Sequence, residues 1–233
     1  PRSPTRDTDM ASLTQQLFMM PGLRAGLLSA PLPADPERAE MMGELQSMLA
    51  TLAYSRRAAF NPAAFCAAFR TFEGGRIEPH EQRDADEFLQ ELFVRLEEGL
   101  EKSPQAAVLD QFFGGALRNQ ILYTAADGSP RLSEREEAYR VLQLPVTPSL
   151  EESLQAFIVG EALQGDNGYQ LDSGEKVDAL KRCCLGAPPH TLIVQLKRFE
   201  FDLATFTKVK INARCTFPEL LDIEPYTAEG IAR

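Results

Sequence analysis

The chain has 233 residues, of which 44% are hydrophobic and 25% are charged, and its formal net charge is −10. This acidic balance disfavours non-specific binding to nucleic acid, whose phosphates repel it. It suits either simple solubility or a basic partner surface. No apolar run approaches the ~20 residues that a membrane-spanning helix needs. We therefore expect neither nucleic acid nor a membrane among the partners.

The four cysteines give no sign of a disulfide framework or of a C-x-x-C metal pair. They are Cys66, Cys183, Cys184 and Cys215. This usage predicts an intracellular protein, in the cytoplasm, the nucleus or both, and no signal peptide is visible. Because the first residue is Pro1 rather than Met, we expect the natural N-terminus to lie upstream.

The N-terminal half shows helical periodicity after a polar tail over residues 1–9. Apolar residues recur at helical spacing over residues 10–20, where a proline–glycine pair breaks the run. Residues 34–55 predict a second helix with a proline in its first turn, and residues 61–72 predict a third, shorter one.

The strongest helix pattern covers residues 84–103. Its apolar stripe has six members: Phe88, Leu89, Leu92, Phe93, Leu96 and Leu100. Asp84 is a natural N-cap, and Glu87 three residues later completes a capping box. Ser149 and Glu152 form the same motif at the start of a later helix.

The C-terminal half is rich in β-forming residues. Residues 112–146 contain short strand-like pieces around a turn at residues 126–131. Residues 190–202 and 206–217 are rich in β-branched and aromatic residues and predict two long strands, and the linker Leu-Ala-Thr between them predicts a hairpin. Helices followed by strands indicate an α+β architecture.

Three segments resemble the ubiquitin-specific proteases, papain-like thiol enzymes that cleave the isopeptide bond after the C-terminal glycine of ubiquitin. Residues 10–24, MASLTQQLFMMPGLR, resemble the helix of the family's cysteine box. Residues 81–97, EQRDADEFLQELFVRLE, resemble its Q-Q-D-A-H-E-F-L motif. Residues 165–227, with LKRFEFD, KVKIN and FPELLDIEPYT, resemble the block that leads from the fingers into the palm. The resemblance covers about residues 10–227.

This resemblance implies a hand-shaped domain with a helical thumb over residues 10–110 and β-rich fingers and palm over residues 111–233. Residues 1–9 do not match. The last part of the palm would then be missing, so we expect one incomplete catalytic domain. The resemblance also implies ubiquitin or a ubiquitinated protein as the partner, and no cofactor.

The resemblance places a Cys-Tyr pair immediately before Met10, where this chain has Thr8 and Asp9. A helix dipole and a nearby imidazolium can lower the pKa of a thiol enough to give a thiolate, but not that of a hydroxyl. Threonine nucleophiles use a free α-amine as base, and Thr8 is internal. Ser3 stands at the position of the oxyanion-hole asparagine. We therefore expect no intact catalytic residue.

The family's catalytic histidine belongs to a G-H-Y block beyond residue 227, and the chain stops at Arg233. The two histidines present do not match that block. His80 is expected in a loop before the acidic helix. His190 follows two prolines at the entrance of a strand, where the family has an L-P-P-x-L pattern, and is expected to be structural.

Many relatives hold a structural zinc between two C-x-x-C pairs at the tip of the fingers. Leu171 and Gly174 stand at one pair of ligand positions, and residues 122–137 contain no cysteine for the other. We therefore expect no metal. Cys183 and Cys184 are expected to be small buried residues on a strand.

The resemblance matches Asp84 and Glu87 to the acidic pair that faces the arginine-containing tail of ubiquitin. Helix capping explains both residues equally well, and one carboxylate can do both. Asp86 replaces the family's histidine and makes the local charge more negative. The basic pair at residues 197–198 leaves two interpretations, binding or outward-facing charge, and strand alternation favours the second.

The function that these motifs favour is that of a deubiquitinating thiol protease, of which this chain is an incomplete and inactive piece. The alternative is a genuine pseudoenzyme that binds ubiquitin or acts as a scaffold. A plain α+β interaction module is disfavoured by the combined motifs. A missing or wrongly joined upstream exon and a true loss both explain the absent cysteine, and the abrupt start of the match at Met10 favours the first.

Overall fold

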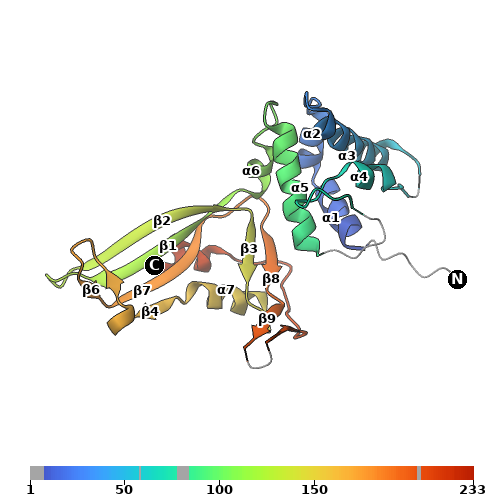
Figure 1. The fold of residues 1–233 in the computed structure, drawn as a ribbon. Coiled ribbons are helices and arrows are strands. Elements are labelled where there is room, and N and C mark those ends of the chain that lie inside the picture. Colours follow the sequence, from blue (N-terminus) through green and yellow to red (C-terminus); the bar gives the residue numbers. More distant parts are fainter. Residues whose placement is uncertain (1–7, 58, 78–83, 204–205) are drawn as a thin grey trace. The chain divides into compact units, whose positions relative to one another are not determined.

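The computed structural model describes residues 8–57, 59–77, 84–203 and 206–233. The chain forms two compact units, Pro1–Phe112 and Phe113–Arg233. The first is helical, and the second is built on β-strands with short helices (Figure 1), so the predicted α+β class is confirmed. Within the described ranges, none of the helices has the length and apolar character needed to cross a bilayer.

The helical unit packs its longer helices around one core. Its helices are α1 (Thr8–Phe18), α2 (Pro21–Ser29), α3 (Pro36–Tyr54), α4 (Ala63–Ala68) and α5 (Ala85–Leu100). Helix α1 packs against α2 and α5, and α3 packs against α2, α4 and α5. Helix α2 was not predicted, because its first residues are the proline–glycine pair. Pro21 begins the helix, where a missing N–H leaves no intrahelical bond unmade.

Helix α5 carries the clearest sequence signal, and the structure confirms it. All six apolar residues of the predicted stripe are buried. Asp84 caps the helix, but its Oδ1 accepts from the backbone N–H of Asp86 at 2.9 Å rather than from that of Glu87. An N-cap side chain can use either of the two N–H groups, so the cap is confirmed in a variant geometry.

Helices α3 and α5 approach each other closely at one glycine. Met42 of α3 is fully buried, and a Cβ atom added to Gly99 of α5 would lie 2.7 Å from its Cγ atom. The close approach therefore depends on the missing side chain of Gly99.

Asp35 caps α3 through a 2.9 Å bond from the Arg38 N–H to its Oδ1.

An antiparallel sheet forms the extended part of the second unit. It consists of β1 (Gly115–Thr124), β2 (Pro130–Tyr139), β4 (Glu161–Leu163) and β7 (Ala179–Ala187), in the order β2-β1-β7-β4. The turn between β1 and β2 is closed by a 2.9 Å bond from the N–H of Ala125 to the carbonyl of Ser129. Gly128 there has φ +81°, which favours glycine. The predicted turn is confirmed.

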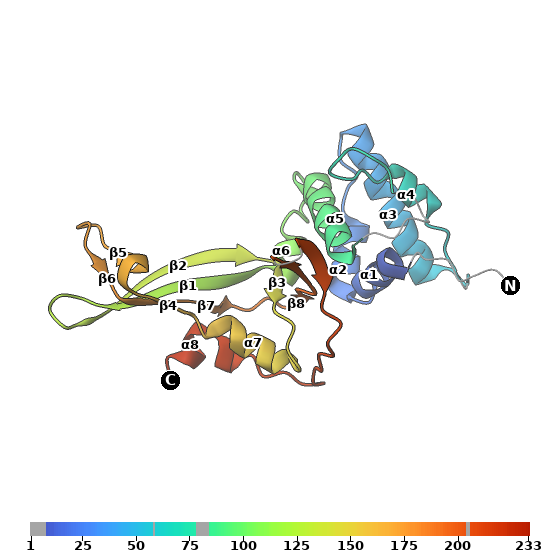
Figure 2. The same ribbon diagram turned by 60° about the horizontal axis from the view of Figure 1, so that its bottom comes forward.

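The other end of this unit holds its core. Strands β3 (Val141–Leu144) and β8 (Ile193–Leu196) pair in parallel. Helices α7 (Leu150–Ile158) and α8 (Ala228–Ile231) both pack against β7 (Figure 2). Eight residues form the buried cluster: Leu142, Leu144, Leu154, Ile158, Cys184, Leu185, Tyr226 and Ala228. Ser149 caps α7 by accepting from the N–H of Glu152 at 3.2 Å, and its hydroxyl donates to Oε1 of Glu152 at 3.4 Å, so the predicted N-cap is confirmed.

Short elements complete the chain. They are α6 (Val108–Phe113), η1 (Gly165–Asn167), β5 (Tyr169–Gln170), β6 (Lys176–Val177), β9 (Phe199–Asp202), β10 (Thr207–Lys210) and η2 (Glu224–Tyr226). Strands β5 and β6 pair with each other, as do β9 and β10.

The single long strand predicted over residues 190–202 is wrong. It is divided into β8 and β9, because the N–H of Lys197 donates to the carbonyl of Leu144 and that of Arg198 donates to the carbonyl of Leu196, both at 2.8 Å. The chain thus turns away from β3 at this basic pair. The predicted hairpin exists between β9 and β10. The second predicted strand is much shorter than expected, and Cys215 lies outside the named strands.

Candidate functional site

The first turn of α1 is the place where the sequence predicts a missing nucleophile. The helix begins at Thr8, but the side chain of Thr8 and the whole of Ser3 lie outside the described residues. Met10 in this turn places its Sδ atom 3.8 Å from the Sγ atom of Cys66 on α4. Cys66 is 1% exposed, so this thiol belongs to the core beside α1. The absence of an intact catalytic residue stays a prediction.

The chain has two histidines. His80 lies outside the described residues. His190 lies before β8 in the second unit, where it is exposed and its Nδ1 atom is 3.4 Å from the Oγ1 atom of Thr191. The structural role of His190 stays a prediction.

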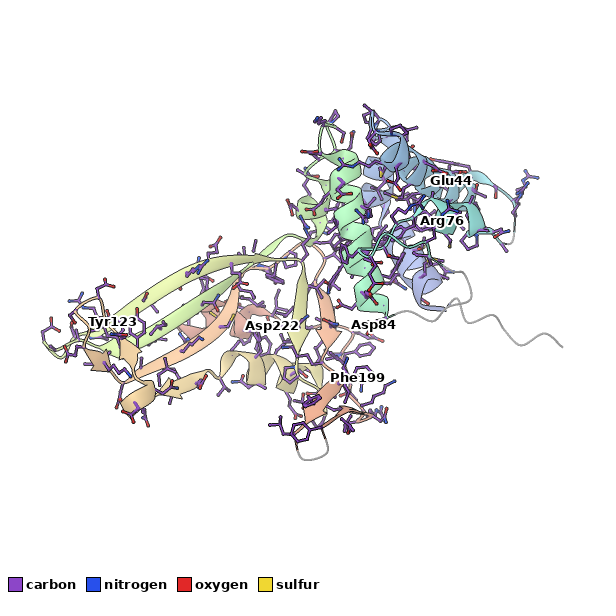
Figure 3. All side chains as sticks on the ribbon, in the orientation of Figure 1. Glu44, Arg76, Asp84, Tyr123, Phe199 and Asp222 are labelled. Carbon is purple, nitrogen blue, oxygen red and sulfur yellow. The ribbon has the colours of Figure 1, made fainter. Side chains whose placement is uncertain are left out.

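The acidic start of α5 presents carboxylates at the surface (Figure 3, Asp84). Asp84 and Glu87 are exposed, and Asp86 is half-buried. The cap occupies Oδ1 of Asp84, and Oδ2 of Asp86 accepts a 2.6 Å bond from Nε2 of Gln90. Anionic side chains at this end are favoured by the helix dipole. The helix end therefore offers negative charge to a basic ligand.

A buried ionic arrangement on the same helix was missed by sequence analysis. Glu91 is 1% exposed, and its Oε1 atom accepts a 2.9 Å bond from the N–H of Phe72. One turn later, Arg95 donates to the carbonyls of Arg70 and Thr71 at 2.9 and 3.1 Å. Together they fix the backbone that precedes α5. The available signal was a glutamate on the apolar side of the helix, three residues after Phe88.

The turn between β5 and β6 contains Leu171 and Gly174, the two positions that the family resemblance matches to zinc ligands. In this turn the N–H of Gly174 donates to the carbonyl of Leu171 at 2.8 Å. The rings of Tyr123 and Tyr169 pack there at a centroid distance of 5.6 Å (Figure 3, Tyr123). In the described ranges, no three metal-ligating side chains are grouped to hold an ion. The absence of zinc stays a prediction.

The adjacent thiols on β7 point to opposite faces of the sheet. Cys184 is buried, as predicted, and Cys183 is only half-buried. Burial is the main cause that raises the pKa of Cys183 to about 11, and burial likewise raises the pKa of Cys184. Both are therefore protonated near neutral pH and unsuited to act as nucleophiles.

A polar network crosses the sheet face that carries Cys184. Gln120 is 4% exposed; it accepts from Nε of Arg182 at 2.7 Å and donates to Glu134 at 2.6 Å. Arg118 pairs with Glu134 at 3.4 Å and with Glu229 of α8 at 3.5 Å. This network ties β2, β1, β7 and α8 together. Its residues are separated too widely in sequence for the pattern to predict it.

The basic pair at residues 197–198 has a structural role on one of its two side chains. Arg198 donates through Nη1 to the carbonyls of Ile211 and Ala213 at 3.2 and 2.8 Å. Lys197 is exposed. The choice between binding and outward-facing charge for this pair stays a prediction.

Comparisons with known proteins give the same family as the sequence motifs. The family profile described as ubiquitin carboxyl-terminal hydrolase matches residues 9–233. Human ubiquitin carboxyl-terminal hydrolase 24 is 34% identical over 227 residues, or 96% of this chain. Human ubiquitin carboxyl-terminal hydrolase 34 is 32% identical over 94% of the chain, and the probable ubiquitin carboxyl-terminal hydrolase FAF of Drosophila melanogaster is 32% identical over 83%. The chain belongs to this family. The resemblance to ubiquitin-specific proteases is thereby confirmed.

The chain spans only a small part of these ubiquitin carboxyl-terminal hydrolases. It corresponds to 8% of the length of the human hydrolase 24 and 6% of that of the human hydrolase 34. The segment matched to the hydrolase family includes Asp84 and Glu87, whereas Ser3 and Thr8 precede it. The acidic end of α5 is thus the part of the predicted site that is both described and within the family match.

Proposed function

We propose that this chain is the ubiquitin-binding part of a deubiquitinase domain and that residues 1–233 by themselves bind ubiquitin without cleaving it. The observation that carries this proposal is the exposed acidic end of α5, within the family match. Asp84 and Glu87 would contact the arginines of the ubiquitin tail. Carboxylates pair well with guanidinium groups because both are planar and can form two parallel bonds.

In a complete enzyme of this kind, a cysteine thiolate would attack the carbonyl after the terminal glycine, and a histidine would act as the base. Thr8 stands where the family resemblance, extended upstream from Met10, places that cysteine. Its hydroxyl cannot be ionised by a helix end, so the chain is expected to hold ubiquitin without forming an acyl intermediate.

The binding part of the proposal is tested by separating charge from capping. In Asp84→Asn the amide still caps the helix but carries no charge. We expect its thermal stability to stay within about 0.5 kcal/mol of wild type and its affinity for ubiquitin, measured by calorimetry, to fall about three- to tenfold. Asp35→Asn removes a carboxylate from the same kind of cap on α3 and should leave ubiquitin affinity unchanged. An unchanged affinity in Asp84→Asn would assign Asp84 to capping alone.

The catalytic part is tested with the unmodified chain. We expect no release of fluorophore from a ubiquitin C-terminal fluorogenic substrate and no covalent product with a ubiquitin vinyl-sulfone probe. Labelling at any residue would contradict this expectation, and mass spectrometry of the adduct would identify the nucleophile.

The alternative is a pseudoenzyme that acts as a ubiquitin-binding scaffold, and the hydroxyl residue at Thr8 is equally consistent with it. Sequencing the mature transcript on both sides of the matched segment separates the two. A Cys-Tyr pair encoded before Met10 together with a downstream Gly-His-Tyr block would support the enzyme, and their absence from the message would support the scaffold.

A further inference from the structure

The chain contains four asparagines, and one of them, Asn167, is followed directly by a glycine. Asparagine is chemically labile because its side-chain carbonyl can be attacked by the backbone nitrogen of the next residue. Glycine hinders this attack least, because it has no Cβ atom. Asn167 ends η1, and Gly168 joins it to β5 at the far end of the extended sheet (Figure 2).

The surroundings of Asn167 leave its side chain able to turn toward its own backbone. Asn167 is exposed, and Gly168 is half-buried. In the part of the chain that the structure describes, the side-chain amide of Asn167 makes no hydrogen bond. An exposed side chain that no partner holds changes rotamer rapidly. The amide can therefore sample the orientation in which its carbonyl carbon faces the nitrogen of Gly168.

One hydrogen bond protects the attacking nitrogen. The N–H of Gly168 donates to the carbonyl of Gly165 at 3.0 Å, and this bond must open before the nitrogen can react. It joins residues only three apart, so its opening is local. The adjoining strands β5 and β6 have two residues each, and a short two-stranded hairpin is only marginally stable by itself. We therefore expect weak protection of this nitrogen.

The other three asparagines lie in settings that oppose the same reaction. Asn61 precedes a proline, whose nitrogen carries no hydrogen. Asn119 lies within β1, which pairs with β2 and β7, and its amide donates to a glutamate of β2 at 3.0 Å. Asn212 is exposed, but the next residue is an alanine, whose Cβ atom hinders the attack. Sequence and structure together single out Asn167.

We propose that Asn167 is a site of spontaneous deamidation. The backbone nitrogen of Gly168 attacks Cγ of Asn167 and forms a C–N bond, which closes a succinimide ring. The side-chain nitrogen takes up the proton that the backbone nitrogen loses, and it leaves as ammonia. A water molecule then adds to either carbonyl carbon of the ring and breaks a C–N bond, giving aspartate or isoaspartate. Water is the co-reactant, and the step involves no oxidation or reduction.

The products change the end of the sheet in different ways. Both add a negative charge at this position. Isoaspartate also inserts a methylene group into the backbone just before Tyr169, whose ring packs against that of Tyr123 at a centroid distance of 5.6 Å. The backbone is tightly packed here, since a Cβ atom added to Gly168 would lie 3.0 Å from the carbonyl oxygen of Gly165. Isoaspartate is therefore expected to disturb the contact between the two rings.

The test follows the 233-residue chain during incubation at physiological temperature and pH. Peptide mapping by mass spectrometry locates each amide that has become a carboxyl group, and labelling by an isoaspartyl methyltransferase detects isoaspartate. We expect Asn167 to convert several-fold faster than each of the other three asparagines. Conversion of Asn212 at the same rate as Asn167 would overturn the proposal.

An unstructured peptide with the sequence of residues 160–175 provides the rate without protection. The folded chain should convert more slowly than the peptide, because the bond from Gly168 to Gly165 must open first, but within the same experiment. If Asn167 of the chain stayed intact while the peptide converted completely, the fold would protect this position and the proposal would be wrong.

A matched pair of variants identifies the modified amide. Asn167→Gln keeps the amide on a longer side chain, whose attack would require a larger and less favourable ring. The gain of negative charge, followed by ion-exchange chromatography, should then be lost. Asn212→Gln should leave this gain as in wild type. Both positions are exposed, so circular dichroism should show both variants folded. An undiminished charge gain in Asn167→Gln would place the reaction elsewhere and refute the proposal.

Discussion

Tyr139, the last residue of β2, is a residue whose burial is not matched by a hydrogen bond. In the part of the chain that the structure describes, its hydroxyl is buried without a partner. Burial raises its pKa to about 12 from the usual value of 10.0. A Cβ atom added to Gly115 would lie 2.7 Å from its ring, so the ring fills the space beside that glycine. The packing of the ring stabilises the fold, whereas burying its hydroxyl opposes folding.

We expect Tyr139→Phe to be neutral or stabilising by up to about 1 kcal/mol at pH 8, because it removes an unpaired buried group and keeps the ring. The phenol of the unfolded chain ionises near pH 10 and that of the folded chain near pH 12. Below pH 10 the phenol is protonated in both states. Between pH 10 and 12 it ionises in the unfolded chain alone, so the free energy of unfolding falls over that range. The variant should lose less stability over that window in urea unfolding. A variant clearly less stable than wild type at pH 8 would show that the hydroxyl has a partner.

At the scale of secondary-structure elements, small residues at the contacts determine how closely the helices pack. Gly43 of α3 and Gly99 of α5 both lie within helices, where glycine costs about 1 kcal/mol relative to alanine. Their surroundings differ. A Cβ atom on Gly43 would meet Leu32 at an ordinary 3.9 Å, and one on Gly99 would meet Met42 at 2.7 Å.

Alanine substitution should therefore have opposite effects at the two glycines. Gly43→Ala should stabilise the chain by about 0.5–1 kcal/mol. Gly99→Ala should destabilise it by about 1–3 kcal/mol, because fully buried Met42 has little room to move. Chemical denaturation of the two variants measures both changes. If Gly99→Ala were as stable as Gly43→Ala, the close α3–α5 contact would be contradicted.

Elements with strong local signals were predictable from the sequence, and those defined by distant contacts were not. Helix α5 followed from its stripe and its cap, and α7 from its capping box. Helix α2 was missed because a proline that begins a helix also looks like a break. The division of β8 from β9 depends on a bond to Leu144 more than fifty residues earlier, and both pieces keep a β-rich composition. No local pattern could indicate it.

The candidate site was predictable to the same extent. The exposed acidic end of α5 followed from the motif that contains Asp84 and Glu87. The contacts of Glu91 and Arg95 with residues 70–72 did not, because they join the helix to a loop whose backbone position only the fold defines. The positions of Thr8 and Ser3 came from the family resemblance alone.

At the scale of the whole molecule, the chain consists of two compact units. The first contains the longest helices, and the second contains the strands. The chain has no tryptophan and five tyrosines, of which Tyr54 lies in the first unit. The other four lie in the second unit: Tyr123, Tyr139, Tyr169 and Tyr226. Tyrosine fluorescence therefore reports mainly on the second unit, and the helical circular dichroism signal mainly on the first.

We expect the two signals to give different unfolding midpoints in urea, because each unit has its own core and two cores can lose their packing separately. The ratio of the two signals should change across the transition. Superimposable curves from both probes would show that the chain unfolds as one cooperative body.

Hydrogen bonds join the two ends of the β9–β10 hairpin, just before β9 and just after β10. The N–H of Ile211 donates to the carbonyl of Arg198 at 2.7 Å, and Arg198 in turn holds the carbonyls of Ile211 and Ala213. These bonds therefore hold together the two points at which the hairpin joins the rest of the second unit. Changes of length between these bonds should therefore leave the pairing of β3 with β8 as it is.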